Sequence, residues 1–175
     1  MEQKQCWHGN KEVLHILNTL PRKILSMHDT HNLVEFIMHE LCNDHCFNIK
    51  KAAYIIDNPD FDFMRGITGF NHQERYNKGN IWASPEDFTT HMNNALFNQK
   101  VRSLHMTSGR RRNENRDTFI KNVADTLGFE RFGCCDIPMK HDNHGIFLFE
   151  GSLDNENEHE SLLNGVSLLS FCPIY

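Results

Sequence analysis

Residues 133–149 read GCCDIPMKHDNHGIFLF, and this stretch decides the fold class. Two apolar runs, 133–139 and 145–149, flank the polar residues 140–144. Apolar runs of this length on either side of a short polar turn are typical of an antiparallel β-hairpin. The sequence therefore predicts two paired strands near the end of the chain.

A second pair of strands is predicted upstream. Residues 52–56 read AAYII, a short run rich in residues that favour strands, and residues 63–70 alternate loosely between apolar and polar. The intervening residues 57–60 read DNPD, which is turn chemistry. Two antiparallel pairs at a distance in sequence indicate one antiparallel sheet.

Helices are predicted around these strands from the spacing of apolar residues at three and four positions. Pro21 should kink or split the first helix. Ser84 and Pro85, followed by two acidic residues, are typical of a helix start, and Gly128 of a helix end. The helices are expected at residues 11–27, 30–46, from 85, from 117 to 128, and from 158 onward. The fold class is α/β (α+β), an antiparallel sheet flanked by helices.

Composition sets outer limits on function. The chain has 175 residues, within the range of one domain, and we divide it into an N-terminal helical segment (1–30) and a single compact domain (31–175). Eighteen basic and twenty-three acidic residues give 18 − 23 = −5, which disfavours nucleic acid as a direct partner. No apolar stretch reaches the length needed to cross a bilayer. The polar start of the chain lacks a secretory signal and the six cysteines show no disulfide framework, so a cytoplasmic protein with reduced thiols is expected.

The hairpin carries a family resemblance. Ile137-Pro138-Met139, a polar tip and the glycine-led run from Gly145 resemble the closing hairpin of GAF and PAS-like sensory domains. Within that group the chain is most similar in outline to the autoinducer-binding domain of LuxR-type quorum-sensing regulators. The features behind this similarity are the helix start at residues 85–88 (PEDF) and the helix end at residues 124–128, and it covers roughly residues 31–172. The resemblance implies a GAF/PAS-like fold that binds a small molecule.

Carried over by residue, the resemblance places Phe88 where the family has a tryptophan over the signal and Met92 where it has a tyrosine. The family's aspartate, which holds the amide of an acyl-homoserine lactone, would fall near Val101, where no acid stands. An ordinary lactone signal is therefore not expected. The family's DNA-binding domain would begin at about Tyr175, so DNA is expected to be contacted only through an output domain outside this sequence.

A pocket between sheet and helices would be mostly apolar with a few polar groups. The bland alternative is that the aromatic and sulfur-containing side chains suited to such a pocket are ordinary core residues. Trp82 and Tyr54 stand out because each needs a partner for its polar tip. The predicted ligand-binding residues are Tyr54, Trp82, Phe88, Met92, Phe132 and Phe147.

Two other kinds of chemistry remain open. His39, Cys42 and Cys46 would share one face of a helix through residue 46 and offer ligands to zinc or haem iron, with His45 nearby. The other possibility is a redox or nucleophilic enzyme, in which Cys134 or Cys135 would be activated by a histidine of the hairpin, His141 or His144, beside Asp136. Neighbouring strand residues face opposite sides, however, so the two cysteines would not share one pocket.

The basic cluster at residues 110–112, with Arg102 and Arg116 nearby, fits a solvated loop or a contact with a partner domain. Taken together, the sequence predicts a sensory domain, not an enzyme, that binds a small and largely apolar signal without a cofactor or metal. A homodimer is expected. Ligand burial is expected to order residues 71–83 and the helix from Pro85, and thereby to change an interface.

Overall fold

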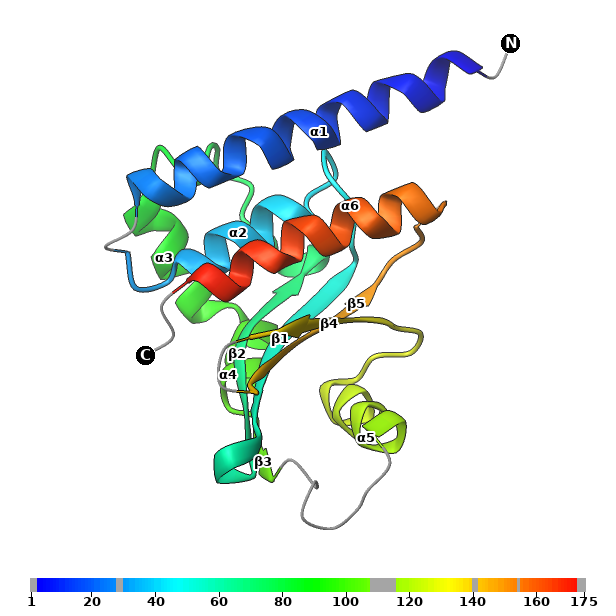
Figure 1. The fold of residues 1–175 in the computed structure, drawn as a ribbon. Helices are drawn as coiled ribbons and strands as arrows, with labels where there is room; N and C mark the ends of the chain where they lie inside the picture. The colour runs from blue at the N-terminus through cyan, green and yellow to red at the C-terminus, as the bar shows by residue number, and fades with distance from the viewer. Residues whose placement is uncertain (1–2, 28–29, 108–115, 140–141, 154, 173–175) are drawn as a thin grey trace.

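The computed structural model describes residues 3–27, 30–107, 116–139, 142–153 and 155–172. Five strands form one antiparallel sheet in the order β3-β2-β1-β5-β4. The strands are β1 (Lys51–Asn58), β2 (Phe63–Asn71), β3 (His105–Thr107), β4 (Gly133–Pro138) and β5 (His144–Glu150). The predicted fold class, an antiparallel sheet flanked by helices, is confirmed (Figure 1).

Six α-helices surround the sheet in the described part of the chain. They are α1 (Gln3–Ser26), α2 (Leu33–Cys42), α3 (Pro85–Asn94), α4 (Leu96–Arg102), α5 (Arg116–Leu127) and α6 (Glu156–Ser167). Short 3₁₀ turns follow β1 (Pro59–Phe61), β2 (His72–Glu74) and α6 (Leu168–Phe171).

The register of the central strands separates two faces. Tyr54 lies opposite Phe147 and its side chain packs toward α2 and α6, whereas Ile55 lies opposite Ile146 and packs toward α5. Successive side chains of a strand point to opposite faces, which is why the apolar run AAYII supplies both cores. The sheet therefore lies between two helical layers.

The first layer consists of α1, α2 and α6, which lie side by side in Figure 1. Its core includes Leu20 of α1, Leu41 of α2 and Leu162 of α6, all fully buried. Pro21 does not split α1, because the helix runs unbroken from Gln3 to Ser26 and its buried face holds it on the layer. Helix α2 is shorter than expected and ends at Cys42.

The second layer consists of α4 and α5. The helix expected from Pro85 ends before Ala95, whose backbone is extended, so that α3 and α4 are separate helices. Helix α4 lies very close to β2: a Cβ at Gly66 would stand 1.9 Å from the carbonyl oxygen of Val101. Only glycine leaves room for that approach.

One strand was not expected from the sequence. The short edge strand β3 follows α4 and was not predicted, because three residues carry too little pattern to recognise.

Across the described helices, none combines the length and the apolar character required to cross a membrane.

Candidate functional site

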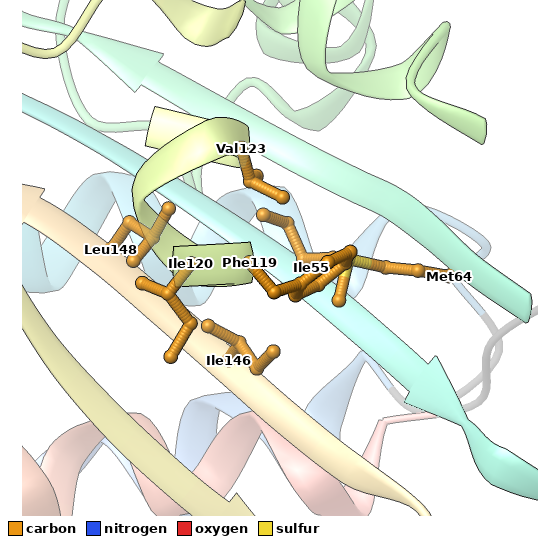
Figure 2. A pocket seen from close by; sticks show the side chains of 7 residues that line it. All are labelled: Ile55, Met64, Phe119, Ile120, Val123, Ile146 and Leu148. Atoms are coloured by element: carbon orange, nitrogen blue, oxygen red, sulfur yellow. The ribbon is translucent and has the colours of Figure 1, made fainter. Parts of the chain in front are cut away.

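An apolar gap lies between α5 and the sheet (Figure 2). It is too narrow to admit a water molecule. Figure 2 shows the side chains of α5 pointing toward those of the strands across this space. Seven apolar side chains line the gap: Ile55, Met64, Phe119, Ile120, Val123, Ile146 and Leu148.

The gap follows from the register of three strands. Ile55 of β1 lies directly opposite Ile146 of β5, and both face α5. Met64 of β2 extends the row toward the sheet edge. Helix α5 places Phe119 and Val123, one turn apart, over this row. Apolar surfaces of the helix and the sheet thus face each other in one core cluster.

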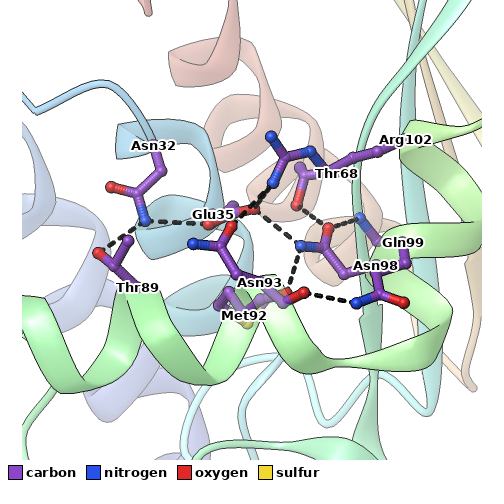
Figure 3. A network of polar contacts seen from close by, with 10 residues as sticks. Asn32, Glu35, Thr68, Thr89, Met92, Asn93, Asn98, Gln99 and Arg102 are labelled. Atoms are coloured by element: carbon purple, nitrogen blue, oxygen red, sulfur yellow. Dashed lines mark hydrogen bonds and ion pairs between the residues drawn. The ribbon is translucent and has the colours of Figure 1, made fainter.

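The helix beside α5 on the same face is held by buried polar contacts (Figure 3). Asn98 of α4, 1% exposed, accepts hydrogen bonds from the Gly69 backbone N–H (2.9 Å) and the Thr68 hydroxyl (3.1 Å). Its Nδ2 donates to the Glu35 carboxylate (2.8 Å) and to the Met92 carbonyl (2.8 Å). One side chain therefore ties α4 to β2, α2 and α3.

Glu35 is the charged centre of this network. Its carboxylate is 4% exposed, accepts from Asn32 Nδ2 (2.9 Å) as well as from Asn98, and lies 3.5 Å from Arg102 Nη1. A buried carboxylate is tolerated when it is paired and hydrogen-bonded in this way. The network accounts for its own polar atoms, and we interpret it as structural.

A cluster of aromatic rings occupies the space between α2 and α3. Phe36 lies 4.4 Å from Phe88 and 5.2 Å from Trp82 between ring centroids. Tyr76 meets Phe88 edge-on at 5.7 Å. Ile81 and Met92 complete the buried cluster, and Met27 packs against it as Trp82 does. Three of the predicted ligand-binding residues, Trp82, Phe88 and Met92, therefore do come together.

His39 is buried beside this cluster. Its Nε2 accepts the backbone N–H of Tyr76 (3.1 Å), which leaves the proton of the neutral ring on Nδ1. Burial, with smaller contributions from His91 and Arg75, lowers the pKa of His39 to about 4, so the ring is neutral at pH 7. Nδ1 of His39 and Nε1 of Trp82 are both buried and without a hydrogen-bond partner.

The other predicted ligand-binding residues lie elsewhere. Tyr54 and Phe147 pack on the opposite face of the sheet, toward α2 and α6, and the Tyr54 hydroxyl lies 3.8 Å from the Met139 sulfur. Phe132 packs at the margin of the α4–α5 layer, beside Phe129. None of the six predicted residues lines the gap under α5.

The residues that do line the gap had weak signals in the sequence. Phe119 and Val123 have the spacing of an inward helix face, and Ile55 and Ile146 lie in the strands recognised from their apolar runs. What a single sequence does not contain is the strand register that sets Ile55 opposite Ile146. Without that register, the sequence favours mainly aromatic residues, not aliphatic ones, as ligand-binding candidates.

The cysteines bear on the redox alternative. Cys134 packs toward α5 and Cys135 toward the opposite face, as strand alternation requires. Burial raises the pKa of each thiol to about 11, and Asp136 contributes for Cys134, whereas Cys134 contributes for Cys135. His144 Nδ1 lies 3.4 Å from Asp136 Oδ1, and His141 lies outside the described residues. Thiols with raised pKa are poor nucleophiles at neutral pH.

The proposed metal ligands do not have the arrangement that the metal-binding alternative requires. Because α2 ends at Cys42, Cys46 lies in the turn that follows and does not share a helix face with His39, contrary to the expectation from spacing. Nε2 of His39 is already used by Tyr76. Within the ranges the structure describes, no three His, Cys, Asp or Glu side chains are grouped as metal ligands.

The basic cluster is only partly placed. Residues 110–112 lie outside the described part. Arg102 is paired with Glu35, and Arg116 Nη2 donates to Asp136 Oδ2 at 2.7 Å. The two arginines therefore belong to contacts within the domain.

Comparison with known proteins does not assign the chain to a family. No family model matches the chain, and neither a curated protein nor a solved structure is significantly similar to it. The resemblance to GAF/PAS-like and LuxR-type sensory domains therefore stays a prediction from the sequence, and the functional argument depends on the geometry of the site.

Proposed function

We propose that this chain is a ligand-binding sensory domain that takes a small, largely apolar molecule between α5 and the sheet. The observation that carries the proposal is the entirely apolar lining of the narrow gap under α5. Ligand pockets are usually concave, mostly apolar and placed between elements of a fixed scaffold.

The lining defines the class of ligand. All seven side chains are apolar, so affinity would come from burial of hydrocarbon, at about 0.8 kcal/mol for each buried methylene group. A strongly charged or hydrogen-bonding group would lose its hydration without a partner among these side chains. The proposed signal therefore presents an aliphatic or aromatic hydrocarbon part to the gap.

Binding would act by shifting a population of conformations. The gap is too narrow for water, so a ligand is accommodated only if α5 moves away from the sheet. A ligand that binds the displaced form better would stabilise it. In a cytoplasmic regulator of the LuxR type, which the sequence resembles, this change would alter a homodimer or domain interface and reach DNA through an output domain outside this sequence.

A cysteine-dependent enzyme is the second candidate, and it is supported less well. It requires a thiolate at Cys134 or Cys135, whereas burial holds the pKa of both thiols near 11. The two variants Cys134→Ser and Cys135→Ser are therefore expected to keep ligand binding, and any turnover of oxidised thiols or sulfoxides that one of them abolished would favour the enzyme.

The proposal is tested by titration with N-phenyl-1-naphthylamine, an uncharged apolar probe that fluoresces when it is buried. The natural protein is expected to bind it saturably. Ile146→Phe adds volume inside the gap and is expected to weaken binding at least tenfold. Leu163→Phe makes a similar enlargement on the exposed side of α6 and serves as the control.

Circular dichroism and thermal unfolding show whether each variant remains folded. Saturable binding lost only in Ile146→Phe is the expected result. Absence of saturable binding in the natural protein, or equal binding by the two folded variants, would contradict the proposal.

A further inference from the structure

Helix α1 is apolar on its outer face as well as on its inner one. The inner face packs on the core through Leu17, Leu20 and Ile24. Leu14 and Leu25, eleven residues apart and therefore on one side of the helix, are 50% and 73% exposed. A surface helix usually presents polar side chains on its outer side. The exposed leucines therefore indicate a surface that is suited to contact with another protein.

The outer face of α1 is also basic. Lys11 lies three residues before Leu14, and Arg22 lies three residues before Leu25, so each cation is a neighbour of one leucine on the helix surface. Both cations are exposed, and neither takes part in an ion pair within the described part of the chain. This face is complementary to a surface that is acidic and partly apolar.

Helix α6 of the same chain carries such a surface. Glu156 and Glu160, one turn apart near its start, are exposed, and among the described residues neither has a cationic partner. The 3₁₀ turn that follows α6 ends at Phe171, whose side chain is 78% exposed. The outer side of α6 is therefore acidic at its start and has an exposed aromatic ring beyond its end.

The two helices lie next to each other in one chain. A Cβ at Gly165 of α6 would stand 3.0 Å from Cδ2 of Leu17 of α1. Both helices run in the same direction (Figure 1). A twofold axis between them and perpendicular to them would therefore set α1 of one copy antiparallel to α6 of a second copy, and this contact would occur twice.

From this complementarity we infer that the outer faces of α1 and α6 form the contact between two copies of this chain. Antiparallel pairing brings Arg22, late in α1, to Glu156 and Glu160, early in α6. It also brings Leu14 toward the Phe171 end of α6. A symmetric interface requires one surface that complements itself, and the two helices together provide it. The inference concerns the side of the sheet away from α5 and does not depend on the proposed ligand.

The size of this surface predicts a weak dimer. Helix α1, with 24 residues, is about 36 Å long, and α6 with its following turn is about 25 Å long. Two adjacent helices, each about 10 Å wide, offer about 500 Å² on each copy over their shared length. A total of about 1,000 Å² is the lower limit for a specific interface. We therefore expect a reversible dimer with a dissociation constant in the micromolar range.

Sedimentation velocity of the natural protein between about 1 and 300 µM tests the inference. The sedimentation coefficient is expected to rise with concentration, and sodium chloride at about 500 mM should weaken the dimer because the contact contains exposed ion pairs. Arg22→Glu and Glu160→Arg are each expected to weaken self-association at least tenfold, since each places like charges at two symmetry-related contacts.

A mixture of the two variants gives the sharpest result. In a mixed dimer, residues 22 and 160 again carry opposite charges at both contacts, so an equimolar mixture should dimerise as the natural protein does. Lys121→Glu and Asp125→Arg are the matched controls, because both residues are exposed on α5, on the other side of the sheet. Neither control is expected to change self-association. Circular dichroism shows that each variant is folded.

Each outcome decides for or against the contact. Loss of the dimer in both single variants, with recovery in the mixture, supports it. A natural protein that stays monomeric up to about 300 µM overturns it and leaves these faces to a different partner. A dimer that neither charge reversal weakens lies on another surface and also overturns it. Folded variants that fail to associate when mixed would contradict the reciprocal pairing of α1 with α6.

Discussion

Helices α4 and α5 cover the same face of one sheet, yet they are attached to it by different physical means. Helix α4 approaches β2 so closely that Gly66 and Gly69 are required beneath it, and Asn98 fastens it with buried hydrogen bonds. Helix α5 is held on the sheet by apolar contacts across a narrow gap, and the side chains that line this gap carry no polar group. Close packing with directional hydrogen bonds fixes one position of a helix, whereas apolar contact across a gap leaves other positions at similar free energy. We therefore expect α5, and not α4, to be the part of the layer that moves.

The largest expected effect is a loss of stability when a methyl group is added where α4 approaches β2. Gly66→Ala would bring a methyl group to 1.9 Å from the Val101 carbonyl, backbone against backbone, and is expected to cost more than about 3 kcal/mol of unfolding free energy. Gly128→Ala at the end of α5 meets no such contact, and its positive φ should cost only about 1 kcal/mol.

Urea unfolding followed by circular dichroism measures both costs. Gly151→Ala serves as the control, because its nearest neighbours lie at ordinary contact distance. Equal losses for Gly66→Ala and Gly128→Ala would remove the distinction between the two helices.

The second effect is a pH dependence on the packed side of the molecule. The folded pKa of His39 is about 4, below its ordinary value of 6.5, so the unfolded chain takes up a proton first as the pH falls. The contribution of His39 is fully present above pH 6.5 and is lost between pH 6.5 and 4, by about 3 kcal/mol in total.

His39→Gln keeps an acceptor for the Tyr76 N–H and removes the titration. The free energy of unfolding of the natural protein should therefore fall more steeply than that of the variant between pH 7 and 4. Parallel pH profiles for the two proteins would show that His39 is not buried in its neutral form.

The smallest expected effect is the difference in stability between two valine variants, and it tests whether α5 can move toward the sheet. Val101 of α4 and Val123 of α5 are both buried, so truncation to alanine removes the same atoms from each helix. Val101→Ala is expected to cost about 2.5 kcal/mol, since the fixed backbone of α4 leaves a cavity. Val123→Ala should cost about 1.5 kcal/mol, because α5 settles toward the sheet and recovers part of the lost contact. Chemical denaturation resolves this difference, and a larger cost at Val123 would contradict a movable α5.

Local sequence patterns were enough to predict much of the fold. The runs AAYII and GIFLF became β1 and β5, and the Ser84-Pro85 signal correctly marked the start of α3. These features depend on propensities within a few residues. The break at Ala95 and the end of α2 at Cys42 were missed, because apolar periodicity continued past both points, whereas the backbone becomes extended at Ala95 and at Asn43.

The candidate site was predicted far less well, for a physical reason. Trp82, Phe88 and Met92 did cluster, but their side chains pack closely against one another and against Phe36, as core residues also do. The gap depends on strand register and on the distance between α5 and the sheet, which are properties of the assembled fold. An isoleucine such as Ile146 has no feature in the sequence that separates a gap-lining position from a packed one.

The most direct test of the account is methyl NMR of the natural protein during titration with N-phenyl-1-naphthylamine. The methyl groups of Ile55, Val123 and Ile146 are predicted to shift through the ring current of the probe. The methyl groups of Leu41, Leu162 and Val166, on the opposite face of the sheet, should remain unchanged. Shifts confined to Ile81 and Met92 would place the ligand in the aromatic cluster between α2 and α3, and would contradict a binding site under α5.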